Sequence, residues 1–186
     1  MLHDTERTAK RLADWMEGLS RFDLPDWEAL PQLDLYMDQV VILLTRYLEP
    51  LSAEEDERAI TASTVNNYVR MKVMPPPVKK KYSRVHIACL VIICTLKQSL
   101  SISCIRRLLP EDRSEESVRA LYTEFVKQYR AALRFVRRLP EVDGSLTLGN
   151  GSFALTSAIL STLSKALTEY LLREEADDDE YDEYDE

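Results

Sequence analysis

Glycine is nearly missing from this chain of 186 residues: it occurs 4 times, and three of the four lie in residues 144–151. The tightest β-hairpins need residues with positive φ, which glycine adopts more readily than any other residue. A chain with so few glycines has few places for such turns, and long helices are favoured. We therefore expect an all-α protein.

The most apolar stretch is residues 87–96, IACLVIICTL. It is about half the roughly 20 residues that a helix needs to cross a bilayer, so we expect a buried core helix and no membrane span. Cys89 and Cys94 lie in this stretch, which favours reduced core thiols over a disulfide framework. The first residues carry charges throughout and lack the apolar segment of a secretory signal, so the expected location is the cytoplasm.

Apolar spacing, caps and prolines divide the chain. The spacing predicts a helix over residues 33–48, and a shorter helix that begins near Thr61 must end at the prolines of residues 75–77. Ser83 and Ser101 are placed to cap two further helices. The predicted parts are an N-terminal helical extension (1–32), a helical domain (33–110), a C-terminal helical hairpin that is a candidate dimerisation region (111–173) and a disordered acidic tail (174–186).

Charge is distributed very unevenly. Residues 58–110 contain ten Lys or Arg and no Asp or Glu, whereas residues 174–186 contain ten acids and no base. The net charge of −8 therefore reflects the tail, and it does not argue against a polyanionic partner for the rest of the chain.

The chemistry that fits such a partner lies in the middle of the basic segment. A helix beginning near Thr61 would present amide and guanidinium groups suited to base edges in a major groove, and its N-terminus suits a phosphate. The stiff prolines that follow would hold three consecutive lysines beside this helix, where they meet the DNA backbone. The candidate DNA-binding residues are Thr61, Ser63, Thr64, Asn66, Asn67, Arg70, Lys72, Lys79, Lys80, Lys81, Tyr82 and Arg84.

Several of these residues occur in a pattern that resembles the MerR-like superfamily, named for the mercury-resistance regulators. The matching positions are Thr64, Val65, Tyr68, the VMPPP of residues 73–77, Tyr82, Ser83, Leu100, Ser101 and residues 105–108. This resemblance implies a winged helix-turn-helix with residues 61–72 as recognition helix and residues 79–82 as wing. It also implies a transcriptional regulator that binds double-stranded DNA, and we expect it to act as a homodimer.

A closer resemblance covers about residues 33–109. The segments LDLYMDQVVILL, TVNNYV, KKKYSRVHIA and LKQSLSI are similar to a bacterial family of unknown function, domain-of-unknown-function family 1836. That resemblance implies a bacterial, cytoplasmic protein and names no biochemistry.

Other interpretations stay open. The same basic face would serve a non-catalytic adaptor that binds an acidic protein, and the lysine run can also be a solvated loop. RNA is less favoured than duplex DNA, because the basic segment has few aromatic residues for base stacking.

No enzymatic activity, cofactor or metal is expected. The sequence contains no phosphate-binding glycine loop, nucleophile motif or paired catalytic carboxylates. His86 and Cys89 stand one helical turn apart, but no further ligand falls at a suitable spacing for a metal.

Overall fold

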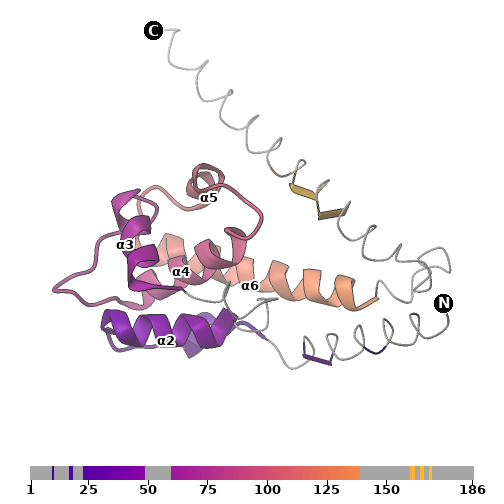
Figure 1. Ribbon diagram of the computed structural model, residues 1–186, viewed down its shortest axis with the longest axis horizontal. Coiled ribbons are helices and arrows are strands. Elements are labelled where there is room, and N and C mark those ends of the chain that lie inside the picture. Colours follow the sequence, from indigo (N-terminus) through magenta and orange to yellow (C-terminus); the bar gives the residue numbers. More distant parts are fainter. Residues whose placement is uncertain are drawn as a thin grey trace, which may run out of the picture. The chain divides into compact units, whose positions relative to one another are not determined.

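The structure is a computed structural model, and it describes residues 10, 17–18, 23–48, 60–138, 160–161, 164–165 and 168 (Figure 1). The chain divides into two compact units, Gly18–Phe135 and a unit formed by Met1–Glu17 with Val136–Glu186. The first unit contains almost everything described below. Of the predicted first and last helices, the structure describes only isolated helical positions. The predicted acidic tail lies outside the described residues.

The described residues are mostly helical, as the scarcity of glycine predicts. The elements are the short 3-10 helix η1 (Trp27–Ala29) and the helices α2 (Met37–Leu48), α3 (Ala62–Arg70), α4 (Arg84–Leu96), α5 (Ile102–Leu108) and α6 (Glu115–Arg138). Within the described ranges, β-structure is limited to two isolated bridges.

Helix α4 is the centre of the domain. Nine consecutive residues, from His86 to Cys94, are buried, so the helix is covered on all sides, as its apolar sequence predicts. Helix α2 packs along α4, α3 packs on α2, and α5 packs on α4. Burial raises the thiol pKa of Cys89 to about 11 and of Cys94 to about 12, so both are protonated, free core thiols at neutral pH.

Serine side chains cap three helices, and those of α4 and α5, Ser83 and Ser101, are the predicted ones. The Ser101 hydroxyl accepts a hydrogen bond from the Cys104 amide at 3.3 Å, and the Ser114 hydroxyl accepts one from the Ser117 amide at 3.2 Å. Ser83 forms a reciprocal capping box in which its own amide donates to Nδ1 of His86 at 3.0 Å.

Two predicted boundaries are wrong. Helix α2 begins at Met37, because Leu35 is held extended by a backbone bridge to Tyr82. Leu33, the first residue of the predicted helix, lies outside α2 and is 81% exposed. Helix α3 ends at Arg70, before the prolines are reached.

A Schellman motif ends α3. The Lys72 amide donates to the Val69 carbonyl at 3.0 Å, and the Val73 amide donates to the Tyr68 carbonyl at 3.1 Å. Lys72 has a φ of 56° and occupies the position that usually takes glycine.

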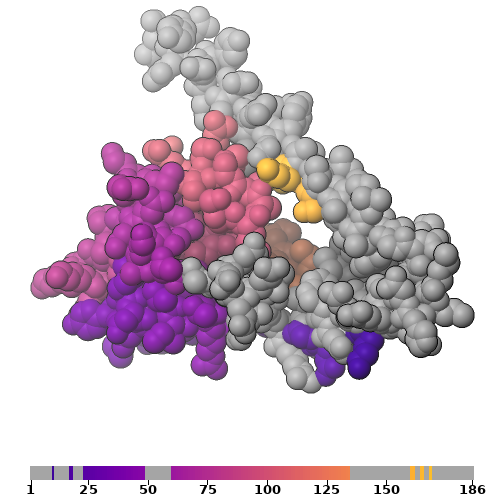
Figure 2. All heavy atoms as spheres, viewed as in Figure 1, coloured from indigo at the N-terminus to yellow at the C-terminus, as the bar shows by residue number. Residues whose placement is uncertain are grey.

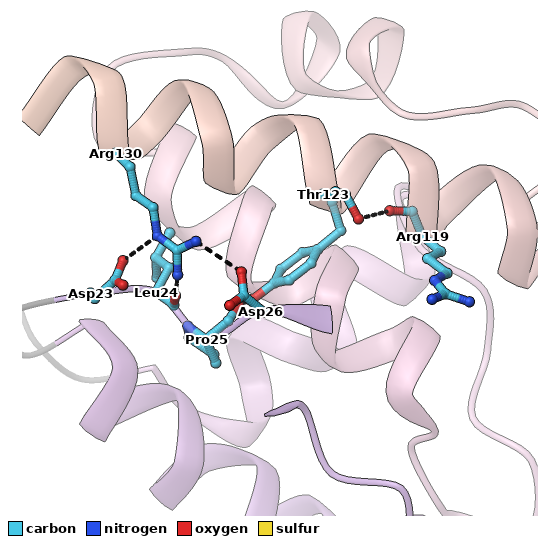
Figure 3. A network of polar contacts seen from close by, with 8 residues as sticks. Asp23, Leu24, Pro25, Asp26, Arg119, Thr123 and Arg130 are labelled. Atoms are coloured by element: carbon cyan, nitrogen blue, oxygen red, sulfur yellow. Dashed lines mark hydrogen bonds and ion pairs between the residues drawn. The ribbon is translucent and has the colours of Figure 1, made fainter. Parts of the chain in front are cut away.

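Helix α6 packs on the segment before α2. The rings of Trp27 and Tyr122 meet edge to face at 6.1 Å, and the Tyr122 hydroxyl donates to the Pro25 carbonyl at 2.8 Å. The Arg130 guanidinium bonds Asp23 at 2.7 Å and Asp26 at 2.8 Å (Figure 3). The inner face of α6, which includes Tyr122, is therefore covered by the N-terminal segment of its own domain.

Candidate nucleic-acid interface

Helix α3 separates its polar and apolar side chains. Val65 and Tyr68 are buried, and burial raises the pKa of the Tyr68 phenol to about 12. Ser63, Asn66 and Arg70 are exposed on the opposite side. The helix therefore presents hydroxyl, amide and guanidinium groups to solvent, as the sequence predicts.

The polar face of α3 is partly ordered by its own hydrogen bonds. The Thr61 hydroxyl caps the helix by accepting from the Thr64 amide at 3.1 Å, and the two threonine hydroxyls lie 2.9 Å apart. Near the other end, Nη2 of Arg70 donates to the side-chain oxygen of Asn67 at 2.7 Å. This bond positions the guanidinium along the helix surface, where it remains exposed.

The lysine run forms a minimal β-hairpin. The backbones of Val78 and Lys81 bond to each other in both directions, at 3.1 and 2.9 Å. The two residues between them, Lys79 and Lys80, have φ values of 51° and 63°. Positive φ at both central residues is the requirement of a type I′ turn, which normally takes Asn-Gly or Gly-Gly.

The base of this hairpin is fixed to the domain at two places. Leu35 and Tyr82 exchange backbone hydrogen bonds at 2.9 and 2.8 Å, and Nε2 of His86 lies 3.2 Å from the Pro76 carbonyl. Since Nδ1 of His86 accepts from the Ser83 amide, Nε2 carries the proton and donates to Pro76. The connection between α3 and α4 projects beyond both helices in Figure 1 and forms a protrusion in Figure 2.

The hairpin lies close to the first turn of α3. A cleft of about 690 Å³ is lined by Lys80, by Ala62 at the start of α3, by Tyr36 just before α2, and by residues of α2 that include Ile42. The Nζ atom of Lys81 lies 5.2 Å from the centre of the Tyr36 ring, a cation–π contact. Lys79 and Lys80 are exposed, so their charges face solvent beside α3.

Three of the predicted DNA-binding residues do not lie on the exposed surface formed by α3 and the hairpin. The Tyr82 side chain is 2% exposed and packs edge to face on His86 at 5.6 Å, so its ring is not on the surface. The Arg84 guanidinium lies 5.7 Å from the centre of the Trp27 ring, and its Nε atom is buried with no partner among the described residues. Lys72 lies past the C-terminal end of α3 and lines a different groove.

Other residues of the site give no local signal in the sequence. Leu35 and Tyr36 pair with the hairpin across almost fifty positions of the chain, and Ile42 is a 70% exposed apolar residue in a helix with an otherwise regular stripe. The described ranges contain no group of three or more His, Cys, Asp or Glu that would hold a metal. None of the described helices has the length and apolar character that a membrane span requires.

These features define a small helical domain with a short basic hairpin next to a polar helix. The chain belongs to the DUF1836 family, described as a domain of unknown function, whose model matches residues 25–126, more than half of the chain. The predicted resemblance to this family is confirmed, and the match extends beyond it to include Trp27 and the first half of α6. No curated protein and no solved structure matches the chain significantly.

Proposed function

We propose that this protein binds double-stranded DNA as a transcriptional regulator, with a MerR-like winged helix-turn-helix. In this proposal α3 is the recognition helix, and the hairpin of residues 78–81 is a very short wing. The order of α2, α3, hairpin and α4 supports it, because this is the order of a helix-turn-helix followed by a wing.

The observation that carries the proposal is the pair of lysines at the hairpin tip. Lys79 and Lys80 both adopt positive φ, a conformation that costs a non-glycine residue about 1 kcal/mol or more. Asn-Gly would form the same turn without that cost, so the two charges are present at the expense of stability. Strain of this kind is found mainly where function requires the side chain.

Each part of the surface has a role in the proposal. Lys79 and Lys80 contact phosphates of the DNA backbone, and Ser63, Asn66 and Arg70 face base edges. A homodimer would place two such helices on a pseudo-palindromic site. In this role the domain acts in the cytoplasm of a bacterium, without an enzymatic step.

A second candidate function is supported by a different observation. Tyr36, Ile42 and Val78 are 53%, 70% and 67% exposed, and exposed apolar side chains near a basic hairpin are also typical of a protein-binding surface. The alternative is therefore an adaptor that binds an acidic protein through the same face.

Binding by fluorescence anisotropy separates the two functions. The full chain would be titrated into labelled random duplex DNA, single-stranded RNA of the same length and an acidic peptide, each at two salt concentrations. The proposal expects micromolar, salt-sensitive binding to the duplex that exceeds binding to the other two probes. Preference for the peptide, with no duplex binding at low salt, would favour the adaptor.

The matched variants use the hairpin geometry. The double variant Lys79→Asn with Lys80→Gly removes both charges and retains the turn, whereas Lys97→Gln removes an exposed charge at the end of α4. Loss of duplex binding in the hairpin variant alone is expected. Equal affinity of the wild type and the hairpin variant for duplex DNA would exclude the hairpin as a DNA-binding wing.

A further inference from the structure

A second basic surface lies at the other end of α3. A groove of about 950 Å³ runs between the end of α3, the proline segment and α5, and we name it the α3–α5 groove. Its basic lining residues are Lys72, Arg106, Arg107 and Arg113. Among the described residues that line it, the one acidic side chain is Glu111, so positive charge is in excess.

The guanidinium of Arg113 has a hydrogen-bond donor without an acceptor in the described part of the domain. Its Nη1 atom is buried and has no hydrogen-bond partner in the described part of the chain. Burial is the main cause that lowers the pKa of Arg113, and the positive charge of Arg106 adds to this effect, whereas Cys89, Glu111 and Asp112 oppose it. A half-buried guanidinium beside a second one is stabilised by an anion that bonds to both.

The backbone supports the same interpretation. Lys72 and Arg113 have φ values of 56° and 50°, and with Lys79 and Lys80 they are the non-glycine residues with positive φ in the described ranges. All four are basic, although glycine or asparagine fits these positions with less strain. Two of the four line the α3–α5 groove, so charge is retained there at a cost as it is in the hairpin.

Apart from Ser103, the remaining lining is apolar. Met74, Pro75, Ile102 and Leu109 contribute to the walls. A volume of this size, with apolar walls and a few convergent polar groups, is typical of small-molecule sites. The ligand that fits both features has an acidic group for the arginines and an apolar body for the walls.

The groove is distinct from the proposed DNA surface. The cleft beside the hairpin includes Ala62 at the start of α3, whereas the groove includes Val69 and Lys72 at and beyond its last turn. Nine helical residues rise about 13 Å. A ligand in the groove therefore leaves the hairpin free.

We propose that the α3–α5 groove binds a small organic anion, in which a phosphate or carboxylate contacts Arg106 and Arg113 and an apolar body contacts Met71 and Ile102. The proposal does not depend on DNA binding. Its chemical basis is charge pairing at one end of the ligand and burial of apolar surface at the other.

The test is a two-dimensional amide NMR titration of the full chain with phenyl phosphate. Saturable shifts are expected at the amides of Lys72, Ser103 and Arg113, and not at those of Lys79 and Lys80. Inorganic phosphate and benzyl alcohol, which each supply half of the recognition, are expected to bind at least about tenfold more weakly. Phenylacetate in place of phenyl phosphate distinguishes a carboxylate from a phosphate ligand.

Two groove variants and one control complete the design. Arg113→Asn removes the guanidinium at a position where asparagine tolerates positive φ, and Arg106→Gln changes an exposed residue of α5. Each variant is expected to weaken the binding of phenyl phosphate at least about tenfold, whereas Lys97→Gln leaves the affinity unchanged. Unsaturable shifts, equal shifts in the hairpin, or unchanged affinity in both groove variants would overturn the proposal.

Discussion

The backbone of Val78 is hydrogen bonded in both directions to that of Lys81, and the two residues enclosed by these bonds are lysines with positive φ. The turn therefore forms without glycine or asparagine. Its geometry is fixed from outside, because Tyr82 is bonded to Leu35 and Pro76 to His86. This anchoring explains how the domain holds two unfavourable residues at an exposed tip.

The first prediction concerns the free-energy cost of positive φ at Lys79 and Lys80. Replacing Lys79 by Asn and Lys80 by Gly should raise the free energy of unfolding by about 1 to 2 kcal/mol, because the new residues fit a type I′ turn. Urea unfolding followed by circular dichroism measures the change. A destabilised variant would show that the lysine side chains support the fold, and the functional interpretation of the strain would fail.

The second prediction concerns pH. Burial is the main cause that lowers the pKa of His86 below its ordinary value of 6.5, and protonation of Nδ1 would break the bond from the Ser83 amide. The unfolded chain then binds more protons than the folded one below pH 6.5, so stability is complete above that pH and falls as the pH drops towards the folded pKa. Urea unfolding at pH 7 and pH 5 should reveal the loss.

A glutamine at this position provides the control. His86→Gln retains an acceptor for the capping box and does not titrate, so its stability should change less between pH 7 and pH 5 than that of wild type. If the two proteins show the same pH dependence, another group is responsible.

The third prediction concerns the attachment of α6. Tyr122→Phe should lower the free energy of unfolding by about 1 to 2 kcal/mol, because it leaves the Pro25 carbonyl without its donor. Thr123→Ala is the matched control, since that exposed hydroxyl bonds within its own helix at 2.8 Å. Equal effects of the two variants would mean that the bond to Pro25 contributes little.

The fourth prediction concerns the acidic tail. Residues 174–186 carry ten acids and are tethered to a domain with a basic segment, so, on the proposed function, we expect them to compete with DNA at high effective concentration. Changing every Asp to Asn and every Glu to Gln in the tail should raise duplex affinity several-fold at low salt, with little effect at high salt. Unchanged affinity at low salt would exclude competition.

Local patterns in the sequence predict much of this domain. The apolar stretch around Leu90 predicts a fully buried helix, and serines followed by helical sequence predict the starts of α4 and α5. These predictions succeed because the sequence pattern that carries each of them lies within a few turns of one helix. The polar face of α3, with Asn66 and Arg70 exposed, follows from the same periodicity.

The sequence fails to predict the features that depend on distant contacts. The bridge between Leu35 and Tyr82 delays the start of α2, and nothing near either residue announces it. The resemblance to the MerR-like superfamily implies a wing at residues 79–82, but local turn rules do not predict the hairpin, because its central residues are lysines and those rules rely on glycine or asparagine. The burial of Tyr82 depends on His86 and on the hairpin, so its ring is hidden although the local sequence is basic.

The most direct test of the proposed function is the slope of log affinity against log salt for duplex DNA, measured for wild type and for the Lys79→Asn, Lys80→Gly variant. The wild-type slope should be negative, and loss of the phosphate contacts of Lys79 and Lys80 should make it less steep by about 2 for each bound protomer. An identical slope in the two proteins, or no duplex binding by wild type at low salt, would contradict the assignment of the hairpin as a DNA-binding wing.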